Sequence, residues 1–575
     1  MTQTDQKITN HDFAKYIEGL IKKEEVEKAL QKCLSLSKTN QKSFLVFYYL
    51  ATIFDIKNDS KNCVLCARQS FHNGVMSIYH LDRLGHMLTK HGQHEEARIC
   101  FEGVLKEYPE KFECLFNVGI AHYKQGNYEE AKKYLEKAHS IEQNYNVFFN
   151  LGIAYRSMHE VERSREYFLK ATKVEPENAE PYFGLASLAE YEGDKELTKQ
   201  YYQKGLKFDP NKCLAYYSIA MLGDNKFIAN ENFIDRIKAL LQTENLSIKD
   251  KGLLNLALGK IYENLKEYNN AFKYYNTGNT HLSSVQRYNP EKIDYIYSCY
   301  QEAFTQERQK TFSKNDCKNT KPIFIVGMPR SGTTLTEQII TSHSQAETIG
   351  ESKYLDHVLK EALKKYNTPP FPMCFERFST EDFKSYGSLY TSHIENEYPK
   401  ARKIINKTPD NFLNVGSIFT LLPNATIINC KRHPLDACLS AYFIGFDDNS
   451  LIYSYHLEDI AKRYKQYVRF MNLWNKEYPN KILDLYYEKL VLEPKKVSQE
   501  LISFCGLQWE DSCIDFSNKK SIVSTASKWQ IRDQIYTDSL FKWKRYDKHI
   551  GVLKDNLQEE IKLYEEELNK QVKIT

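Results

Sequence analysis

Residues 323–340 read IFIVGMPRSGTTLTEQII, and this stretch decides the fold of the C-terminal half of the chain. The apolar run 323–326 leads into a short loop between Gly327 and Gly332, after which the pattern becomes helical. The two glycines are spaced as in a Walker A loop, but Thr333 stands where the lysine of that motif would be. A strand, loop and helix in this order present backbone N–H groups and a positive helix end to an anion. The stretch therefore predicts a phosphate-binding loop.

The side chains of the loop are suited to the same task. Ser331, Thr333 and Thr334 supply hydroxyl donors next to Gly332, and the guanidinium of Arg330 can bind two phosphate or sulfonate oxygens at once. The missing lysine argues against an ordinary nucleotide triphosphatase, and most of the apolar strands further on end in Asn, Lys or Arg, which are poor ligands for Mg²⁺. We therefore expect no metal at this site. A plain strand-to-helix turn is the alternative.

Short β-rich runs alternate with helical ones after the loop, and this alternation defines the fold class. It is typical of a mostly parallel sheet with helices on both faces. We predict an α/β, P-loop-like domain with a parallel sheet. The further strands are expected at 347–350 (ETIG), 401–406 (ARKIIN), 425–430 (ATIINC) and 481–487 (KILDLYY).

Charged residues follow three of these expected strands directly. Glu351 follows the second strand of the domain, Lys407 the third, and Lys431 and Arg432 the fourth. Ligands of open α/β sheets bind beyond the carboxyl ends of the strands. Together with the loop, four consecutive strand ends thus carry groups suited to one anionic transfer site. An exposed glutamate and an exposed lysine at a turn are the ordinary alternatives for Glu351 and Lys407.

The sequence PRSGTTL after a buried strand resembles the 5′-phosphosulfate loop of sulfotransferases. The arginine in the loop and the glutamate after the next strand are similar to those of protein-tyrosine sulfotransferases and of bacterial tetratricopeptide–sulfotransferase fusions. The resemblance covers about residues 321–550, in scattered motifs. It implies transfer of sulfonate from 3′-phosphoadenosine 5′-phosphosulfate to an acceptor hydroxyl.

The resemblance also implies catalytic roles for three residues. Glu351 would be the base that accepts the proton of the acceptor hydroxyl. Lys407 and Arg330 would stabilise the charge that develops on the leaving group, without a metal. The family often has a second acidic residue beside the base, whereas Gly350 and Ser352 flank it here.

Contacts with the donor are implied in the same way. Arg432 and Ser440, eight residues apart, resemble the pair that binds the 3′-phosphate. Tyr487 resembles a tyrosine near the nucleotide, with Tyr486 as the alternative, because successive residues of a strand face opposite sides. The segment 524–546 resembles the part of the family that closes over the donor. The expected donor contacts are Arg330, Ser331, Gly332, Thr333, Thr334, Arg432, Ser440, Tyr487, Ser527 and Lys542.

The N-terminal half contains an internal repeat. Small residues, each preceded by an aliphatic one, recur with gaps of 34, 34, 33, 34 and 34 residues. A single helical hairpin cannot bury its apolar face, so such units must stack. The pattern resembles the tetratricopeptide repeat over about 44–223, with one more repeat at 252–279. The recurring small residues are Ala51, Gly85, Gly119, Gly152, Ala186 and Ala220.

These patterns divide the chain into four expected parts. The array should bind a protein or peptide, or else act as a scaffold that supports the adjoining domain. The polar stretch ending at Pro322 is a plausible boundary before the first strand. The parts are an N-terminal helical cap (1–43), the tetratricopeptide-repeat array (44–280), a helical linker (281–320) and the sulfotransferase domain (321–575).

Composition excludes some classes of partner. The 575 residues carry 79 basic and 75 acidic side chains, a balance that argues against nucleic acid or an anionic membrane. We find no signal peptide and no apolar run long enough to span a membrane. The thirteen cysteines include one C-x-x-C pair, Cys63 and Cys66, which we interpret as ordinary thiols in a reducing compartment. We therefore expect a cytoplasmic protein, and a homodimer is left open.

The sequence offers several candidates for the acceptor. The repeat array and the motif resemblance favour a hydroxyl on a protein or peptide, with tyrosine as one candidate. The known eukaryotic tyrosine enzymes of the family work in a secretory compartment, and no entry signal is visible here, so a glycan or a small molecule stays open. Two other functions compete: a repeat-based interaction scaffold with a catalytically silent domain, and a small-molecule or nucleoside kinase that would need Mg-ATP.

Overall fold

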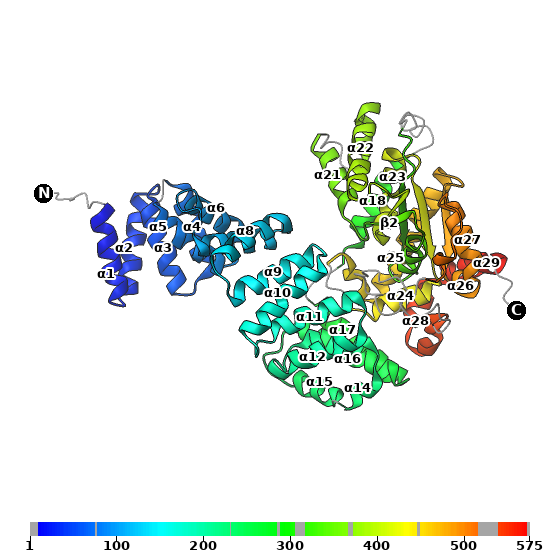
Figure 1. Ribbon diagram of the computed structural model, residues 1–575, viewed down its shortest axis with the longest axis horizontal. Helices are drawn as coiled ribbons and strands as arrows, with labels where there is room; N and C mark the ends of the chain where they lie inside the picture. The colour runs from blue at the N-terminus through cyan, green and yellow to red at the C-terminus, as the bar shows by residue number, and fades with distance from the viewer. Residues whose placement is uncertain are drawn as a thin grey trace. The chain divides into compact units, whose positions relative to one another are not determined.

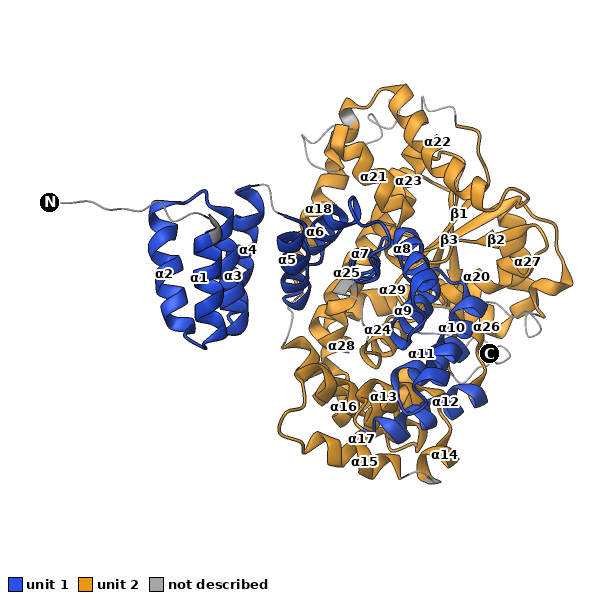
Figure 2. Cartoon of the chain, turned by 60° about the vertical axis from the view of Figure 1, so that its left-hand side comes forward, with its two compact units in different colours: residues 1–189, 196–210 blue, residues 190–195, 211–575 orange. Residues whose placement is uncertain are grey.

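The structure is a computed structural model. It describes residues 10–74, 77–230, 232–284, 288–304, 317–365, 372–445, 449–515 and 539–571. The chain forms two compact units (Figure 2), residues 1–189 with 196–210 and residues 190–195 with 211–575. The division falls inside the predicted repeat array, after Pro210, and the predicted domain boundaries stay predictions.

The first unit is helical throughout its described part. Helices α1 (Asn10–Lys22) and α2 (Val26–Thr39) precede a series of helical hairpins. The predicted repeats are confirmed as hairpins of two helices of similar length. They are α3 (Phe44–Ile56) with α4 (Ser60–His72), α5 (Ile78–Lys90) with α6 (His94–Leu105), α7 (Phe112–Lys124) with α8 (Tyr128–Ile141), α9 (Tyr145–Ser157) with α10 (Val161–Val174), and α11 (Glu180–Glu192) with α12 (Lys195–Phe208).

The recurring small residues let the two helices of a hairpin approach closely. A Cβ added at Gly152 would lie 2.7 Å from the ring of Phe168, well inside van der Waals contact. The same ring lies 2.7 Å from the Cβ position of Gly184 in the next repeat. The ring of Phe168 thus fills the space beside its own partner helix and the space toward the following hairpin.

The second unit begins with the rest of the array. Its helices are α13 (Cys213–Leu222), α14 (Asn225–Asn230), α15 (Phe233–Leu241), α16 (Ile248–Asn264), α17 (Tyr268–Ser283) and α18 (Pro290–Ala303). Helix α17 packs on α24 (Pro434–Tyr442) of the α/β domain: Asn279 Nδ2 donates a hydrogen bond of 2.7 Å to the carbonyl of Tyr442. The ring of Tyr275 stacks on that of Phe443 at 4.1 Å. The last repeat and the sheet domain therefore share one hydrophobic core.

Among the residues that the structure describes, five parallel strands form the sheet of this unit, in the order β2-β3-β1-β4-β5. The parallel α/β fold predicted from the alternation of strands and helices is confirmed. Because all strands run in the same direction, their carboxyl ends meet at one edge. The strands are β1 (Pro322–Gly327), β2 (Ala346–Thr348), β3 (Lys403–Lys407), β4 (Thr426–Lys431) and β5 (Ile482–Tyr486).

Helices cover both faces of the sheet (Figure 1). Ile323 and Ile325 of β1 belong to a cluster on the face of α20 (Thr333–Thr341) and α27 (Pro494–Phe504). Phe324 and Val326 point to the other face and to a larger cluster. That cluster includes residues of α18, α21 (Tyr354–Lys365), α22 (Thr380–Glu397), α23 (Val415–Leu421), α24 and α25 (Leu457–Glu477). Alternation along one buried strand therefore supplies both halves of the core.

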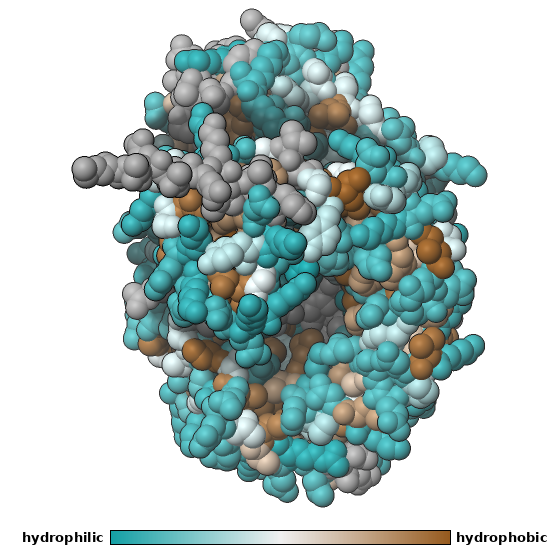
Figure 3. Space-filling model, turned by 90° about the vertical axis from the view of Figure 1, so that its left-hand side faces the viewer, coloured by the Kyte–Doolittle hydropathy of each residue, from teal (hydrophilic) through white to brown (hydrophobic). Residues whose placement is uncertain are grey.

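The remaining helices follow the last strand. They are α26 (Tyr487–Leu492), α28 (Gly551–Asn556) and α29 (Gln558–Gln571). Among the described helices, none is both long and apolar enough to cross a membrane. On the face drawn in Figure 3, hydrophilic residues predominate and apolar ones lie in separate small groups. All thirteen cysteines are free thiols.

Candidate active site

The loop between β1 and α20 has an unusual backbone. Gly327 and Gly332 have φ values of +146° and +96°, and Arg330 has a φ of +71°, which residues with a Cβ rarely adopt. A Cβ at Gly332 would lie 2.6 Å from Cδ2 of Tyr487, so only glycine fits there. Strain of this kind persists where surrounding contacts hold it, often at ligand-binding loops.

The hydroxyl groups of the loop are buried at the start of α20. Ser331, Thr333 and Thr334 are each at most 6% exposed. The hydroxyl oxygen of Ser331 has no hydrogen-bond partner among the described residues. A buried hydroxyl without a partner costs free energy, which a bound acceptor oxygen would recover.

Arg432 reaches from the end of β4 to this loop. Its Nη1 donates a hydrogen bond of 2.9 Å to the carbonyl of Arg330, and its Nη2 donates one of 2.7 Å to the carbonyl of Ser539. The guanidinium carbon lies 4.6 Å from the centre of the Tyr487 ring. In the part of the chain that the structure describes, its buried Nε has no partner. Two hydrogen bonds and the Tyr487 ring thus hold the guanidinium of Arg432 in place, and its buried Nε–H is available to donate to a ligand.

The structure also brings Arg330 and Ser440 together. Arg330 extends toward α24, where its Nε donates a hydrogen bond of 3.2 Å to the hydroxyl of Ser440. Ser440 lies in the second turn of α24, which begins directly after Arg432 and His433. The residues expected to bind the two phosphate groups of the donor are therefore neighbours.

Lys407, at the end of β3, lies between two carboxylates. Its side chain is 1% exposed and its ammonium group forms an ion pair with Glu351, whose side chain is 49% exposed. The same Nζ lies 3.9 Å from Oε2 of Glu337 in α20. The N–H of Lys407 donates a hydrogen bond of 2.9 Å to the carbonyl of Gly350. The ends of β2 and β3 are thus joined through both backbone and side chains.

Glu337 is a residue of this cluster that the sequence analysis did not identify. It is 8% exposed, and Thr348 donates a hydrogen bond of 2.6 Å to its Oε1. Burial raises the pKa of Glu337, while Lys407 and the hydrogen bond from Thr348 act in the opposite direction. In the sequence, Glu337 is a single acidic residue within the apolar run that follows the loop. Many helices contain such a residue, so this pattern does not indicate a site. Its position beside Lys407 requires the fold.

The structure separates the two tyrosines that the sequence left as alternatives. Tyr487 lies against Gly332 and Arg432, and its hydroxyl hydrogen-bonds that of Ser539 at 2.8 Å. Tyr486 faces away from this group: its hydroxyl donates a hydrogen bond of 2.8 Å to Glu567 of α29. Ser539 had no signal in the sequence, because its main contribution is a backbone carbonyl.

Of the two residues expected from the closing segment, the structure describes only one. Ser527 lies outside the described residues. Lys542 is described, and its ammonium group forms a buried ion pair with Glu263 of α16. Burial lowers the pKa of Lys542, and Glu263 opposes that effect. A donor contact for Lys542 stays a prediction.

The two halves of the chain match two different families of known proteins. Residues 322–511 match the model of the sulfotransferase family. Residues 112–145, 145–178, 179–212 and 254–278 match models of the tetratricopeptide repeat.

Individual relatives cover only parts of the chain. An uncharacterized protein of Aquifex aeolicus (strain VF5) is 31% identical over 348 residues, which are 59% of this chain and 45% of that protein. Protein-tyrosine sulfotransferase 1 of Danio rerio is 24% identical over 241 residues, 39% of this chain and 66% of the relative. Among solved structures, the C-terminal part of a tetratricopeptide repeat-containing protein from Cytophaga hutchinsonii has a TM-score of 0.31 at 19% identity, covering 45% of this chain and 98% of that one.

The chain thus spans about half to two thirds of the length of these relatives. The family match includes the loop and the strand ends at residues 351, 407 and 432. Residues 322–511 thus match the sulfotransferase family, in one chain with segments that match the tetratricopeptide repeat.

Proposed function

We propose that the chain is a sulfotransferase, which transfers the sulfonate group of 3′-phosphoadenosine 5′-phosphosulfate to an acceptor hydroxyl. The observation that carries the proposal is the convergence at one sheet edge. Arg432 hydrogen-bonds the carbonyl of Arg330 in the loop after β1, and Lys407 pairs with Glu351 at the ends of the neighbouring strands. The match of residues 322–511 to the family supports it.

The residues present fit a donor that carries phosphate groups. Ser331 Oγ and Arg432 Nε are both buried and lack a partner within the described part of the chain. Both can donate to phosphate oxygens, and backbone N–H groups at the start of α20 can do the same. Residues 330–334 would hold the 5′-phosphosulfate, and Arg432 with Ser440 the 3′-phosphate. Tyr487 would lie near the nucleotide, and Ser527 and Lys542 would complete the contacts.

The chemistry then needs one base and two cations. The donor supplies the sulfonate group. Glu351 accepts the proton of the acceptor hydroxyl as the acceptor oxygen bonds to sulfur. The bond between sulfur and the bridging phosphate oxygen breaks, and its electron pair stays on that oxygen in adenosine 3′,5′-bisphosphate. Lys407 and Arg330 stabilise this charge.

Lys407 has to exchange partners in this scheme. The ammonium group of Lys407 is paired with Glu351, the same carboxylate that is proposed to take the proton. Moving toward the leaving oxygen would free Glu351, while Glu337 at 3.9 Å still compensates the buried charge. The two carboxylates would therefore have different tasks: Glu351 reacts, and Glu337 keeps Lys407 charged and in place.

For the acceptor, we propose a hydroxyl on a protein or peptide, with tyrosine as one candidate. The repeat array supports this because stacked helical hairpins commonly form surfaces that bind proteins. The matched protein of Danio rerio is named a protein-tyrosine sulfotransferase, and the likeness to it is the second support. The proposal includes a cytoplasmic location and a protein or peptide partner for the array.

Binding of two nucleotides tests the donor site first. We expect the purified chain to bind adenosine 3′,5′-bisphosphate at least about tenfold more tightly than ATP in calorimetric titrations, because we propose that Arg432 and Ser440 bind a 3′-phosphate, which ATP lacks. Equal affinity or a preference for Mg-ATP would contradict the proposal and favour a kinase.

Transfer of radiolabelled sulfonate from the donor into a cell lysate then tests the acceptor. Label in protein that yields labelled tyrosine on hydrolysis supports the tyrosine assignment. Label in glycan or small molecules would refute the protein acceptor and keep the sulfotransferase. Nucleotide binding without any transfer would instead favour a silent domain on a scaffold.

A further inference from the structure

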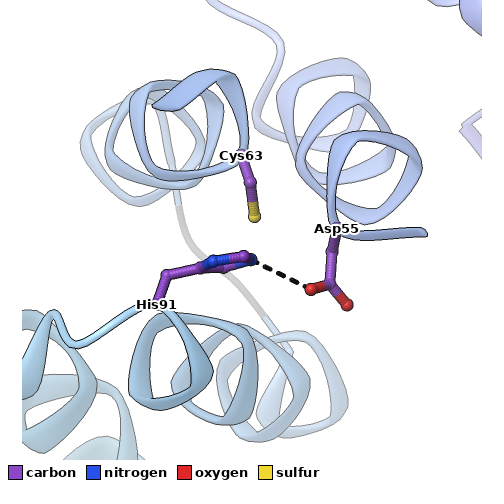
Figure 4. A group of neighbouring side chains, drawn as sticks. All are labelled: Asp55, Cys63 and His91. Carbon is purple, nitrogen blue, oxygen red and sulfur yellow. Dashed lines mark hydrogen bonds and ion pairs between the residues drawn. The ribbon is translucent and has the colours of Figure 1, made fainter. Parts of the chain in front are cut away.

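Three side chains of different chemistry meet in the first unit. Asp55 lies in the last turn of α3, Cys63 in the first turns of α4, and His91 directly after α5. Figure 4 shows the three side chains pointing toward one another from three helices. Within the described part of the chain, they form the one group of three such residues that could hold a metal ion.

The ligand atoms lie at short range. The carboxylate oxygen of Asp55, Sγ of Cys63 and a ring nitrogen of His91 are all within 4.8 Å of one another. His91 Nε2 is 3.0 Å from Asp55 Oδ1. Ligand atoms of a tetrahedral Zn²⁺ are separated by roughly 3.5 Å, given metal–ligand bonds of about 2.0–2.3 Å. The separations of the three ligand atoms, 3.0 Å for one pair and at most 4.8 Å for all, lie on either side of this value.

Two helix ends add a favourable field for a cation. Helices α3 and α5 both have their carboxyl ends at the cluster, since Asp55 precedes the last residue of α3 and His91 follows the last residue of α5. A helix carries a partial negative charge at this end, from carbonyl groups without a helical partner. This feature is independent of the three side chains and also favours positive charge.

The thiol needs a proton acceptor or a cation to become a ligand. Burial and, to a smaller extent, the nearby Asp55 carboxylate together raise the pKa of Cys63 to about 12. The thiol therefore keeps its proton when no cation is present, and a bound metal would release that proton to water.

We propose that Asp55, Cys63 and His91 form a binding site for Zn²⁺ or a chemically similar transition-metal ion, with water as the fourth ligand. Thiolate, imidazole and carboxylate together suit zinc and its neighbours. Mg²⁺ and Ca²⁺ are excluded by their demand for oxygen ligands. The ion would link α3, α4 and α5, and so join two successive repeats. The site is independent of the proposed sulfotransferase activity.

Lys90 gives the proposal a distinctive test. Its ammonium group lies 2.8 Å from Asp55 Oδ1, the same oxygen that His91 contacts, and its side chain is 54% exposed. A metal ion must displace this cation from Asp55. Replacing Lys90 by methionine should therefore tighten metal binding, whereas an Asp–His–Lys cluster without metal function predicts no effect.

The experiment uses the full chain after treatment with a chelator, and Co²⁺ as the spectroscopic probe. We expect one equivalent of Co²⁺ to produce a thiolate-to-cobalt charge-transfer band in the near ultraviolet, which Zn²⁺ abolishes by displacement. Cys63→Ser should eliminate the band. Cys66→Ser is the matched control: it changes the same residue type one turn away in α4 and should leave the band intact.

Affinities complete the test. His91→Gln should weaken Co²⁺ binding by more than about tenfold. Substituting a residue that only hydrogen-bonds a metal ligand already lowers metal affinity by about 10–100-fold, and His91 is proposed to be a ligand itself. Lys90→Met should strengthen it by severalfold. Absence of the band in the unmodified chain, its persistence in Cys63→Ser, or equal loss in Cys66→Ser would overturn the site. Circular dichroism of each variant shows whether a loss of metal binding comes from a loss of folding. The side chain of Lys90 is exposed, so Lys90→Met changes no buried residue.

Discussion

Lys407 is a buried positive charge in the candidate site. Its side chain is 1% exposed and has carboxylates on two sides, from Glu351 and Glu337. A buried ammonium group is tolerated only when it is paired, because desolvation of an isolated charge is expensive. The half-exposed Glu351 is the partner that can leave, since water can solvate it. Burial thus distinguishes two chemically identical carboxylates: Glu337 is buried, and Glu351 is half exposed.

At this scale, Glu351→Gln should reduce the rate of sulfonate transfer by about 10²–10⁴-fold, because the amide cannot take the acceptor's proton. Affinity for adenosine 3′,5′-bisphosphate should stay within a few fold of the unmodified chain. Transfer kinetics and calorimetry measure the two quantities. Glu347→Gln, at an exposed position of β2, is the matched control and should change neither. A similar rate loss in the control would refute the assignment of the base.

Arg432→Lys tests the donor site at the same scale. Lysine retains the charge but cannot donate simultaneously to the carbonyls of Arg330 and Ser539 and stack on Tyr487. Loss of one or two charge-assisted hydrogen bonds should weaken nucleotide binding by about 10–100-fold. Calorimetric titration checks this, with Arg402→Lys at an exposed position as control. Unchanged affinity would mean that Arg432 is structural only.

At the scale of elements, the loop and the repeats depend on close backbone approach in different ways. Gly332 is required by a positive φ and by the ring of Tyr487 against it. Gly152, in contrast, has ordinary helical geometry, and its hydrogen atom is needed only because Phe168 packs on it. Its carbonyl also accepts a buried hydrogen bond of 2.7 Å from Ser164. The pair α9 and α10 is therefore held at a separation that one methyl group would change.

Two alanine substitutions test this directly. Gly152→Ala should destabilise the first unit by about 1–3 kcal/mol, because the new Cβ lies 2.7 Å from Phe168. Gly19→Ala in α1 makes the same chemical change where nothing lies within 4 Å, and should be neutral or stabilising by up to about 1 kcal/mol. Urea unfolding followed by circular dichroism gives both values. Equal effects would contradict the packing explanation.

At the scale of the whole molecule, the repeat array does not end where the sheet domain begins. Helix α16 belongs to the same compact unit as the sheet. Its Glu263 pairs with Lys542 and Lys260, and the hydroxyl of Tyr275 donates to it a hydrogen bond of 3.1 Å. Burial alone would raise the pKa of Glu263, but the two ammonium groups outweigh it and lower the pKa to about 2. The pair of Glu263 and Lys542 thus ties the last repeat to the C-terminal part of the segment 524–546.

This pair predicts a loss of stability in acid. Because the folded pKa of Glu263 lies below its ordinary value of 4.5, the unfolded chain binds the proton first as pH falls. The stabilisation is therefore complete above pH 4.5 and is lost as the pH drops toward 2. The double variant Glu263→Gln, Lys542→Met lacks this contribution. Its urea midpoint for the second unit should fall less between pH 5 and pH 3 than that of the unmodified chain; an identical fall would refute the assignment.

Local patterns were sufficient for much of this protein. The 34-residue spacing of small residues predicts stacked hairpins, and the run 323–340 predicts a strand, an anion-binding loop and a helix. Both depend on neighbours in the chain: helical and strand periodicities are properties of short segments. The charged residues after each strand could also be grouped, because the carboxyl ends of parallel strands share an edge whatever the order of the strands.

The tertiary structure alone decided which of these groups touch. Glu337 and Lys407 are seventy residues apart, and Arg432 meets the carbonyl of Ser539 across more than a hundred. Such pairs depend on the strand order β2-β3-β1-β4-β5 and on which helix covers which face. The meeting of Asp55, Cys63 and His91 likewise depends on how successive hairpins stack. The physical reason is that periodicity sets the face of each element, whereas packing between elements sets its neighbours.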